Sequence, residues 1–257
     1  MKAPVTKIGI NLYSVREYCK TPGDLDKSLG KLKEIGYEAV QVSGIGGIPV
    51  QAAAELVAKH GLWCCATHEG IDAFLKGLDA VIEKMRLLNC DFTALGMPPE
   101  TYFAPGGADR LAAELSTASR KLRENGIVLG YHNHSAEFER FGGQLFYQDL
   151  FAKADKSLAA EIDTYWVQHG GSDPASWIKK LKGRVPVIHF KDYAIIDRKP
   201  HECEIGEGNL DWKAIISACK SSGTRWYVVE QDNPVPNKDI FTSLAQSYGN
   251  LRKMGVR

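Results

Sequence analysis

Three side chains of the kinds that bind metal ions lie at the ends of three successive apolar segments. They are Asp163, His189 and Glu230. Two carboxylates and one imidazole, if brought together, suit a divalent cation such as Mn²⁺, Mg²⁺, Co²⁺ or Zn²⁺. Taken singly, Asp163 could cap the turn that follows it, Glu230 could pair with Lys191, and His189 could be a hydrogen-bonded core residue. Together they favour a metal site, because unpaired charges are costly to bury.

The elements that carry these residues alternate regularly along the chain. Apolar runs predict eight strands, at 7–15, 38–45, 62–70, 91–98, 127–134, 158–167, 185–193 and 225–232. Segments with helical spacing of apolar residues predict a helix after each strand, at 23–35, 50–60, 73–88, 108–124, 147–154, 173–182, 210–221 and 237–253. Such alternation implies a parallel sheet, and eight units in 257 residues match a closed (β/α)8 TIM barrel that forms a single domain over residues 1–257. An open doubly wound sheet is disfavoured, because no glycine-rich nucleotide-binding motif follows any strand.

In a TIM barrel the chemistry lies at the C-terminal ends of the strands. Residues two apart on a strand share a face, so three pairs are expected to point into the barrel: Glu161 with Asp163, His189 with Lys191, and His132 with His134. Three further residues are candidates for binding substrate. His68 ends the third strand, Glu137 follows the fifth and could orient His134 or bind a hydroxyl, and Glu207 lies in a Gly-rich loop that could cover the site. A structural role for His68, a solvated Glu137 and a turn position for Glu207 are the alternatives.

The composition limits the partners and the compartment. The chain has 44% apolar and 25% charged residues and a formal net charge of +1, without a basic stripe, so neither nucleic acid nor a membrane surface is expected as a partner. Six cysteines without a CxxC pair predict reduced, buried thiols. The N-terminus has no apolar segment, which favours a cytoplasmic protein, unless a signal sequence has been removed.

Four motifs together resemble one family. The segments "EIDTYWV", "VIHFKDY", "GEGNLDW" and "YVVEQD", in this order, are similar to the sugar phosphate isomerase/epimerase family of xylose-isomerase-like TIM barrels, and the similarity extends over nearly the whole chain. The resemblance implies a metal held at the ends of strands five to eight, in many members by Glu, Asp, His and Glu. Carried over to this sequence, these positions are His132, Asp163, His189 and Glu230.

The sequence departs from the family pattern at two positions. His132 occurs where a glutamate is common, so a mechanism with two acid/base glutamates cannot simply be transferred. Trp166 replaces a histidine that contacts substrate in the epimerases, which implies different substrate contacts. The segment "HFKDY" resembles the H-x-K-D of the inosose dehydratase branch and makes Lys191 a candidate to bind a substrate oxygen or act as a general acid.

The expected function is a divalent-metal-dependent isomerase or epimerase that acts on a small sugar or keto-sugar through a metal-stabilised enediolate. Glu230 and His132 are the candidate bases, and Lys191 is the candidate acid. The alternative is a dehydratase of a keto-cyclitol or 3-keto-sugar, because removal of the proton next to the carbonyl is common to both reactions. An AP-endonuclease-like enzyme and a non-catalytic sugar-binding barrel rank lower, and the oligomeric state stays open.

Overall fold

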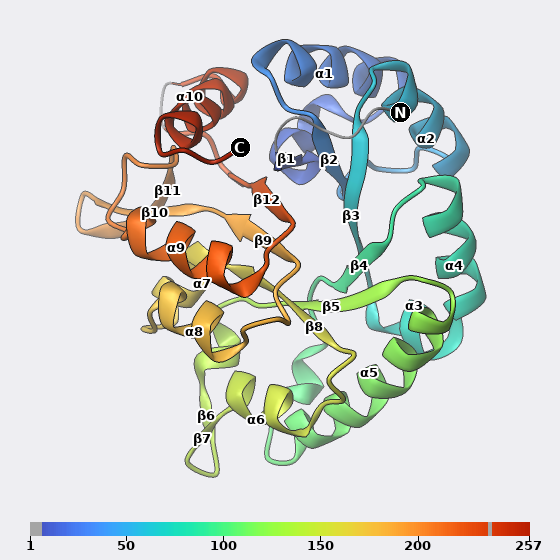
Figure 1. The fold of residues 1–257 in the computed structure, drawn as a ribbon, viewed down its shortest axis with the longest axis vertical. Coiled ribbons are helices and arrows are strands. Elements are labelled where there is room, and N and C mark those ends of the chain that lie inside the picture. Colours follow the sequence, from blue (N-terminus) through green and yellow to red (C-terminus); the bar gives the residue numbers. More distant parts are fainter. Residues whose placement is uncertain (1–6, 236–237) are drawn as a thin grey trace.

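The computed structural model describes residues 7–235 and 238–257. Within them, eight parallel strands close into a barrel, in which neighbours follow the order β1-β12-β9-β8-β5-β4-β3-β2 (Figure 1). The strands are β1 Ile8–Asn11, β2 Ala39–Val42, β3 Trp63–Glu69, β4 Phe92–Leu95, β5 Val128–His132, β8 Ala159–Asp163, β9 Val187–Phe190 and β12 Trp226–Val229. The predicted single TIM barrel is confirmed.

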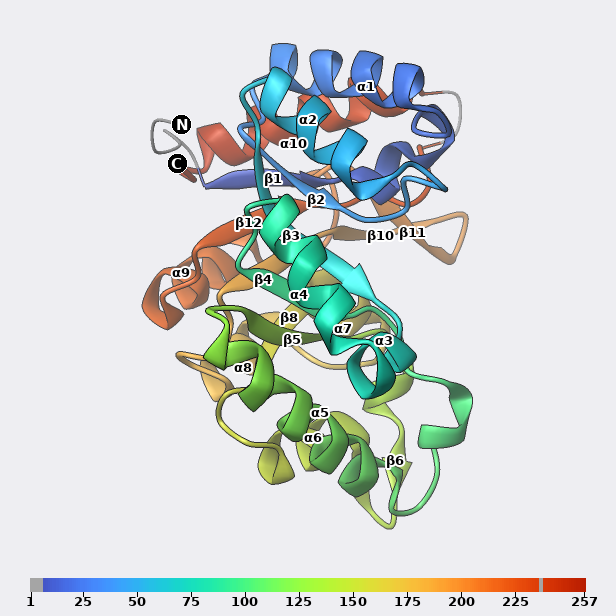
Figure 2. The ribbon, with the colours of Figure 1, turned by 90° about the vertical axis from the view of Figure 1, so that its right-hand side faces the viewer.

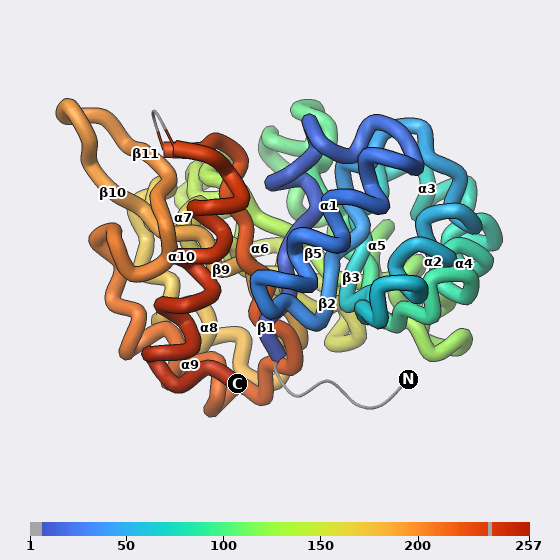
Figure 3. The backbone as a smooth tube through the Cα atoms, turned by 90° about the horizontal axis from the view of Figure 1, so that it is seen from above, coloured from blue at the N-terminus to red at the C-terminus, as the bar shows by residue number. Residues whose placement is uncertain are grey.

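The helices surround the barrel on its outside (Figures 2 and 3). They are α1 Pro22–Ile35, α2 Val50–Lys59, α3 Ile71–Lys76, α4 Leu78–Leu87, α5 Gly107–Glu124, α6 Phe146–Lys153, α7 Thr164–His169, α8 Pro174–Lys180, α9 Trp212–Ser222 and α10 Ile240–Lys253. The last helix, α10, packs beside α1, so the two ends of the described chain meet (Figure 3). No helix among the described residues is long and apolar enough to cross a membrane.

Several predicted elements are shorter or divided in the structure. The strand predicted over 7–15, for example, ends at Asn11 and is followed by a 3₁₀ helix, Leu12–Tyr18. The helix predicted over 73–88 is two helices, α3 and α4, because Gly77 has non-helical backbone angles (φ −127°, ψ 25°) and ends the first. The strand predicted over 158–167 ends at Asp163, whose carboxylate accepts the backbone N–H of Trp166 and thereby caps α7. Apolar residues continue across this boundary, and so the sequence pattern did not reveal it.

Two β-hairpins were not predicted. One joins β6 (Arg140–Phe141) and β7 (Gln144–Leu145), and the other joins β10 (Asp192–Ile196) and β11 (Lys199–Cys203). The second hairpin turns at Asp197 and Arg198, which adopt positive φ angles of 50° and 64°. Positive φ in a hairpin turn favours Asn, Asp and Gly, and only the first of these two residues, Asp197, is of these types.

The barrel interior has an apolar lower layer and a polar upper layer. Small and medium apolar side chains and one aromatic ring, that of Phe92, fill the lower layer: Ala39, Cys65, Ala66, Phe92, Ala94, Ala159, Val187 and Val228. Further along the strands, Gln41, Glu161, Asp163 and His189 are fully buried. Buried polar groups are costly unless they are paired, so this upper layer is the place to look for chemistry. All six cysteines are buried and free, as predicted.

Candidate active site

A pocket of about 360 Å³ opens at the C-terminal ends of the strands, where TIM-barrel active sites lie. Its lining residues are Asn11, Tyr13, Ser43, His68, Gly96, Met97, His132, His134, Trp166, Lys191, Glu230 and Asp232. Six of the ten site residues predicted from the sequence are in this lining. Two more, Asp163 and His189, are fully buried and belong to the cluster that His132 and Glu230 complete.

This cluster consists of His132, Asp163, His189 and Glu230, from four adjacent strands of the barrel. One nitrogen or oxygen atom of each residue lies within 4.8 Å of those of the others. The Nδ1 atom of His189 is 2.7 Å from Glu230 Oε2 and 4.0 Å from Asp163 Oδ2. The strand register sets Asp163 directly beside His189. Two imidazoles and two carboxylates at such distances are a ligand set for a divalent cation.

The hydrogen bonds of the two carboxylates test whether a cation fits. Asp163 accepts the Trp166 N–H with Oδ1 (3.0 Å), whereas Oδ2 is buried and has no hydrogen-bond partner among the described residues. Glu230 accepts the Asn11 side-chain N–H with Oε1 (2.8 Å) and turns Oε2 to His189. Burial raises the pKa of Asp163 to about 8. A cation would satisfy this buried oxygen, and the residues therefore fit a metal.

The orientation of His189 also suits a ligand. Its Nε2 is 2.8 Å from Gln41 Oε1, an acceptor, so Nε2 carries a proton and Nδ1 faces the two carboxylates. Burial acts to lower the pKa of His189, but Glu161 and Glu230 outweigh it and hold this pKa well above its usual range. A cation at Nδ1 would take the place of the Nδ1 proton, while the hydrogen bond to Gln41 remains.

Lys191 provides a buried positive charge on the pocket wall. Its side chain is 1% exposed, forms a short ion pair with Asp232, and lies 3.5 Å from Glu202 Oε1. Burial acts to lower the pKa of Lys191, but the surrounding carboxylates, Glu230 first among them, outweigh it and raise the pKa above its usual value. The ammonium group is therefore protonated and can donate to an oxygen in the pocket. Asp232 and Glu202, which hold it, were not predicted as site residues.

His134 and Trp166 form another part of the wall. Their ring centroids are 5.3 Å apart, and the His134 ring also packs edge-on against His132 at 4.8 Å. Burial lowers the pKa of His134 to about 4, so its imidazole is neutral. The indole of Trp166 lies 5.4 Å from the Lys191 ammonium. A neutral imidazole and an aromatic face suit contact with a polyhydroxylated ring.

The structure does not bring Glu137 and Glu207 to the pocket. Glu137 is fully buried and accepts hydrogen bonds from the Tyr131 hydroxyl (2.8 Å) and the His134 backbone N–H (2.9 Å), so it shapes the loop after β5. Glu207 is exposed and accepts a hydrogen bond from Asn250 of α10 (2.9 Å). The loop of Glu207 is fixed by Asp192, whose carboxylate accepts the N–H groups of both flanking glycines.

Sequence reasoning gave no role to Glu161, which the structure places among three imidazoles. With His68, His132 and His189 it forms a second group of ligand-type side chains. The only signal in the sequence was its position two residues before Asp163, which put both on the inner face of β8. Asn11 and Gln41 were likewise missed, because their partners, Glu230 and His189, are distant along the chain.

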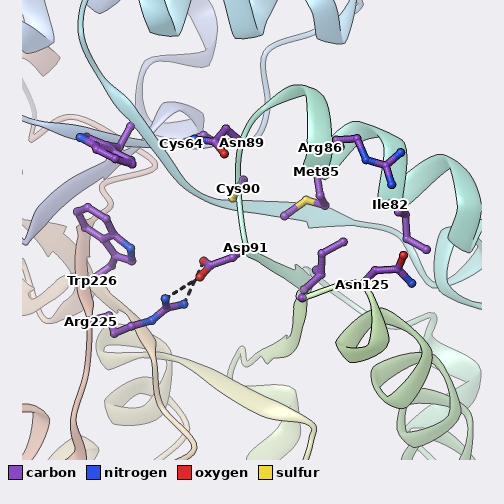
Figure 4. Close-up of a pocket in the computed structure, with 13 residues that line it drawn as sticks. Cys64, Ile82, Met85, Arg86, Asn89, Cys90, Asp91, Asn125, Arg225 and Trp226 are labelled. Carbon is purple, nitrogen blue, oxygen red and sulfur yellow. Dashed lines mark hydrogen bonds and ion pairs between the residues drawn. The ribbon is translucent and has the colours of Figure 1, made fainter. Parts of the chain in front are cut away.

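A larger cavity of about 450 Å³ lies at the opposite end of the barrel (Figure 4). Trp63 and Trp226, the first residues of β3 and β12, flank it, and Arg225 forms a two-pronged ion pair with Asp91 (2.7 and 3.0 Å). This end of a TIM barrel contributes mainly to stability. The ion pair joins the beginnings of β4 and β12 across the barrel base.

Comparison with known proteins agrees with this architecture. Residues 29–249 match a family model described as a xylose isomerase-like TIM barrel. An inosose dehydratase of Lacticaseibacillus casei is 26% identical over 165 residues, which are 57% of this chain and 55% of that protein. The match therefore spans only about half the length of this curated relative.

Solved structures share the whole fold at low sequence identity. A sugar phosphate isomerase/epimerase from Parabacteroides distasonis has a TM-score of 0.85 at 20% identity and covers 100% of this chain and 98% of its own. An L-ribulose 3-epimerase has a TM-score of 0.71 at 17% identity, with 98% and 95% coverage. A probable 3-DHS dehydratase from Bacillus anthracis has a TM-score of 0.71 at 11% identity, with 96% and 98% coverage.

Proposed function

Because this chain belongs to the xylose isomerase-like TIM barrel family, we propose that it is a divalent-metal-dependent isomerase or epimerase of a small sugar or keto-sugar. The observation that carries the proposal is the convergence of His132, Asp163, His189 and Glu230 beneath a pocket that also presents the Lys191 ammonium. A pocket of about 360 Å³ has room for a monosaccharide-sized ligand.

A divalent cation held by these four residues would act as a Lewis acid on a substrate carbonyl. Glu230 is the group to which we assign removal of the proton next to that carbonyl. Burial acts to raise the pKa of Glu230, but His189 and Lys191 outweigh it and hold the pKa well below its usual range, so the carboxylate is ionised. Return of the proton to the opposite face gives an epimer, and return to the neighbouring carbon gives an isomer.

His132 and Lys191 complete the proton transfer. Burial lowers the pKa of His132 well below its usual value, so at neutral pH the imidazole is uncharged and has one ring nitrogen free to accept a proton. The Lys191 ammonium, held by Asp232, can donate to the substrate oxygen on which negative charge develops. His68, His134 and Trp166 are proposed to contact the substrate, since all three line the pocket.

A dehydratase of a keto-cyclitol or 3-keto-sugar is the second candidate. The specific observation in its favour is the protonated Lys191 on the pocket wall, which could protonate a departing hydroxyl. The curated relative named inosose dehydratase supports the same candidate. The first half of the reaction, proton removal by Glu230, would be unchanged.

The test is a substrate screen followed by NMR in D₂O. Ketohexoses, 3-keto-glycosides, hydroxypyruvate and inososes are incubated with the protein and Mn²⁺, with a chelator-treated sample as the control. A new epimer or isomer with deuterium at the reacting carbon supports the first candidate, and loss of water supports the second. If no compound in these classes shows exchange, conversion or loss of water, the proposed function is wrong.

A further inference from the structure

The pocket at the C-terminal ends of the strands has two unlike halves. One half lies at the ends of β5, β8, β9 and β12 and contains the carboxylates and the ammonium group of the lining, together with the proposed metal ligands His132 and Glu230. The other half lies at the ends of β1, β2, β3 and β4, which are also neighbours in the barrel. Among its described residues there is no carboxylate, lysine or arginine, and the lining there consists of Asn11, Tyr13, Ser43, His68, Gly96 and Met97. This uncharged half is available to the part of a substrate that does not react.

Tyr13 forms a fixed aromatic surface in the uncharged half. Its side chain is 40% exposed, although the ring is held by two neighbours. The Arg16 guanidinium lies over the ring, 4.3 Å from the centroid, and donates to the carbonyl oxygens of Tyr13 (3.0 Å) and Asp232 (2.9 Å). The ring also packs closely against Gly44, where an added Cβ atom would lie 2.6 Å from Tyr13 Cδ2. A side chain that is held in place before a ligand arrives loses little conformational entropy on binding.

Met97 is a second exposed apolar side chain, at the other end of the uncharged half. It follows β4, is 53% exposed and lines the pocket as Tyr13 does. The methionine side chain is unbranched and adapts to ligands of different shape. Exposed apolar side chains beside a cavity are typical of a ligand-binding groove.

Polar partners for a ligand are few in this half. The Asn11 side chain donates to Glu230 and accepts the Tyr13 backbone N–H, so its amide is already used. His68 Nε2 is bonded to Glu161. Ser43 Oγ is buried and has no hydrogen-bond partner among the described residues. A hydroxyl-rich group placed here would give up hydrogen bonds to water and regain few of them, which favours an apolar group.

We propose that Tyr13 and Met97 form a subsite for an apolar aglycone, so that the substrate is a keto-sugar that carries an aromatic ring rather than a free sugar. The inference rests on the proposed function, because the reacting carbonyl must bind at the metal site in the charged half. The aglycone then lies against Tyr13 and Met97, and Ser43 Oγ is available to the oxygen that joins it to the sugar. Its burial removes the apolar surface of the ring and of both side chains from water.

The experiment compares two probes that differ only in the aglycone, phenyl β-D-glucopyranoside and methyl β-D-glucopyranoside. Neither contains a carbonyl, so binding is measured without turnover. Their dissociation constants for the protein in the presence of Mg²⁺ are obtained by NMR titration. We expect the phenyl probe to bind about 10-fold more tightly than the methyl probe, because the ring buries additional apolar surface.

Substitutions then locate the preference. Tyr13→Ala and Met97→Ala should each bring the ratio of the two dissociation constants toward 1, whereas Tyr13→Phe, which keeps the ring, should retain the ratio. Tyr18→Ala is the matched control and should also retain it, because Tyr18 is 47% exposed but lies outside the pocket lining.

Equal affinity of the unsubstituted protein for the two probes, or binding of neither, overturns the inference. A ratio that is unchanged in both Tyr13→Ala and Met97→Ala overturns it as well. The substrate screen in D₂O separates this outcome from the proposed function. Exchange into a free ketohexose without a preference for the phenyl probe refutes the subsite alone, and a phenyl preference without exchange into any compound refutes the proposed function alone.

Discussion

At the residue scale, the site is a balance of buried charges. Asp163, Glu161 and Glu230 are fully or almost fully buried, and the positive groups that face them are His189 and Lys191. Each carboxylate uses some of its oxygens for positioning: Asp163 caps α7, and Glu230 binds Asn11. The other oxygens of these two residues, Asp163 Oδ2 and Glu230 Oε2, face His189 Nδ1. A capping role and a metal-binding role for Asp163 are therefore compatible.

The first prediction concerns that remaining oxygen. Asp163→Asn keeps an oxygen that can cap α7 but removes the negative charge, so the fold should persist while bound metal falls below about a tenth of the unsubstituted level. Metal content after dialysis, measured by plasma mass spectrometry, checks this. Asp173→Asn is the matched control, because Asp173 caps α8 in the same way and is exposed. A full metal content in Asp163→Asn would contradict the assignment of Asp163 as a metal ligand.

The second prediction concerns Glu230 as the base. Glu230→Gln retains the hydrogen bond with Asn11 in shape but cannot accept a proton from carbon, so deuterium exchange from D₂O into substrate should fall by about 10²- to 10⁴-fold. Metal content is measured alongside, because Glu230 is also a proposed ligand. Exchange that continues unchanged would remove Glu230 from this role and leave His132 as the base.

At the element scale, close contacts between neighbouring strands set the position of His132. Gly130 lies two residues before it on β5, and a Cβ atom at this position would lie 2.4 Å from Phe92 Cζ on β4. Phe92 belongs to the apolar lower layer of the barrel. A glycine is therefore required here by space, although its position in a strand would otherwise be unfavourable.

The third prediction follows from this contact. Gly130→Ala should lower the free energy of unfolding by about 1–3 kcal/mol, because the added methyl group must displace a packed ring or the strand. Gly249→Ala is the control: it lies in α10 with no atom within 4 Å of its added Cβ, and should stabilise the protein by about 0.4–1 kcal/mol. Urea unfolding followed by circular dichroism measures both. Equal stability of the two variants would contradict the packing argument.

The β10–β11 hairpin holds two residues of the pocket wall, Lys191 and Asp232, in place. Its Glu202 accepts the backbone N–H groups of Asp232 (2.5 Å) and Asn233 (3.2 Å), and also lies near the Lys191 ammonium. Glu202 thus holds Asp232 and Asn233, which follow β12, beside Lys191, which follows β9. The hairpin, which lies between β9 and β12 in the chain, therefore fixes the ion pair of Lys191 and Asp232.

At the scale of the whole molecule, closure of the barrel joins the two ends of the chain in one site. Asn11 on β1 binds Glu230 after β12, a separation of 219 residues, and β1 pairs with β12 in parallel. The site can therefore form only when the barrel is closed. A ligand that binds only the closed barrel must stabilise the whole fold.

The fourth prediction measures this linkage. Metal at about 100 times its dissociation constant should add about 2.7 kcal/mol of stability, which for a protein of this size corresponds to an increase in melting temperature of about 5–10 °C. Differential scanning calorimetry with and without Mn²⁺, in chelator-treated buffer, checks it. Asp163→Asn should show no increase. An equal increase in both proteins would place the binding elsewhere.

The sequence by itself determined the alternation of eight strands and helices, and with it the barrel and the end at which polar residues gather. These features depend on local periodicity and on the period-two alternation of strands, which a single chain displays directly. Asp163, His189 and Glu230 could be selected for the same reason, because each follows an apolar run. The same alternation placed His132 and Lys191 on the inner face of their strands, and the motifs then implied a role for each.

Only the tertiary structure decided how these residues face one another. Which nitrogen of His189 faces Glu161 depends on side chains from β2, β8 and β12, and no local pattern encodes this arrangement. The turn of the hairpin that holds Lys191 contains no glycine. Glu207 is hydrogen-bonded to Asn250 of α10 and so lies away from the pocket. Such contacts join residues far apart in the chain, so they exist only once the barrel has closed.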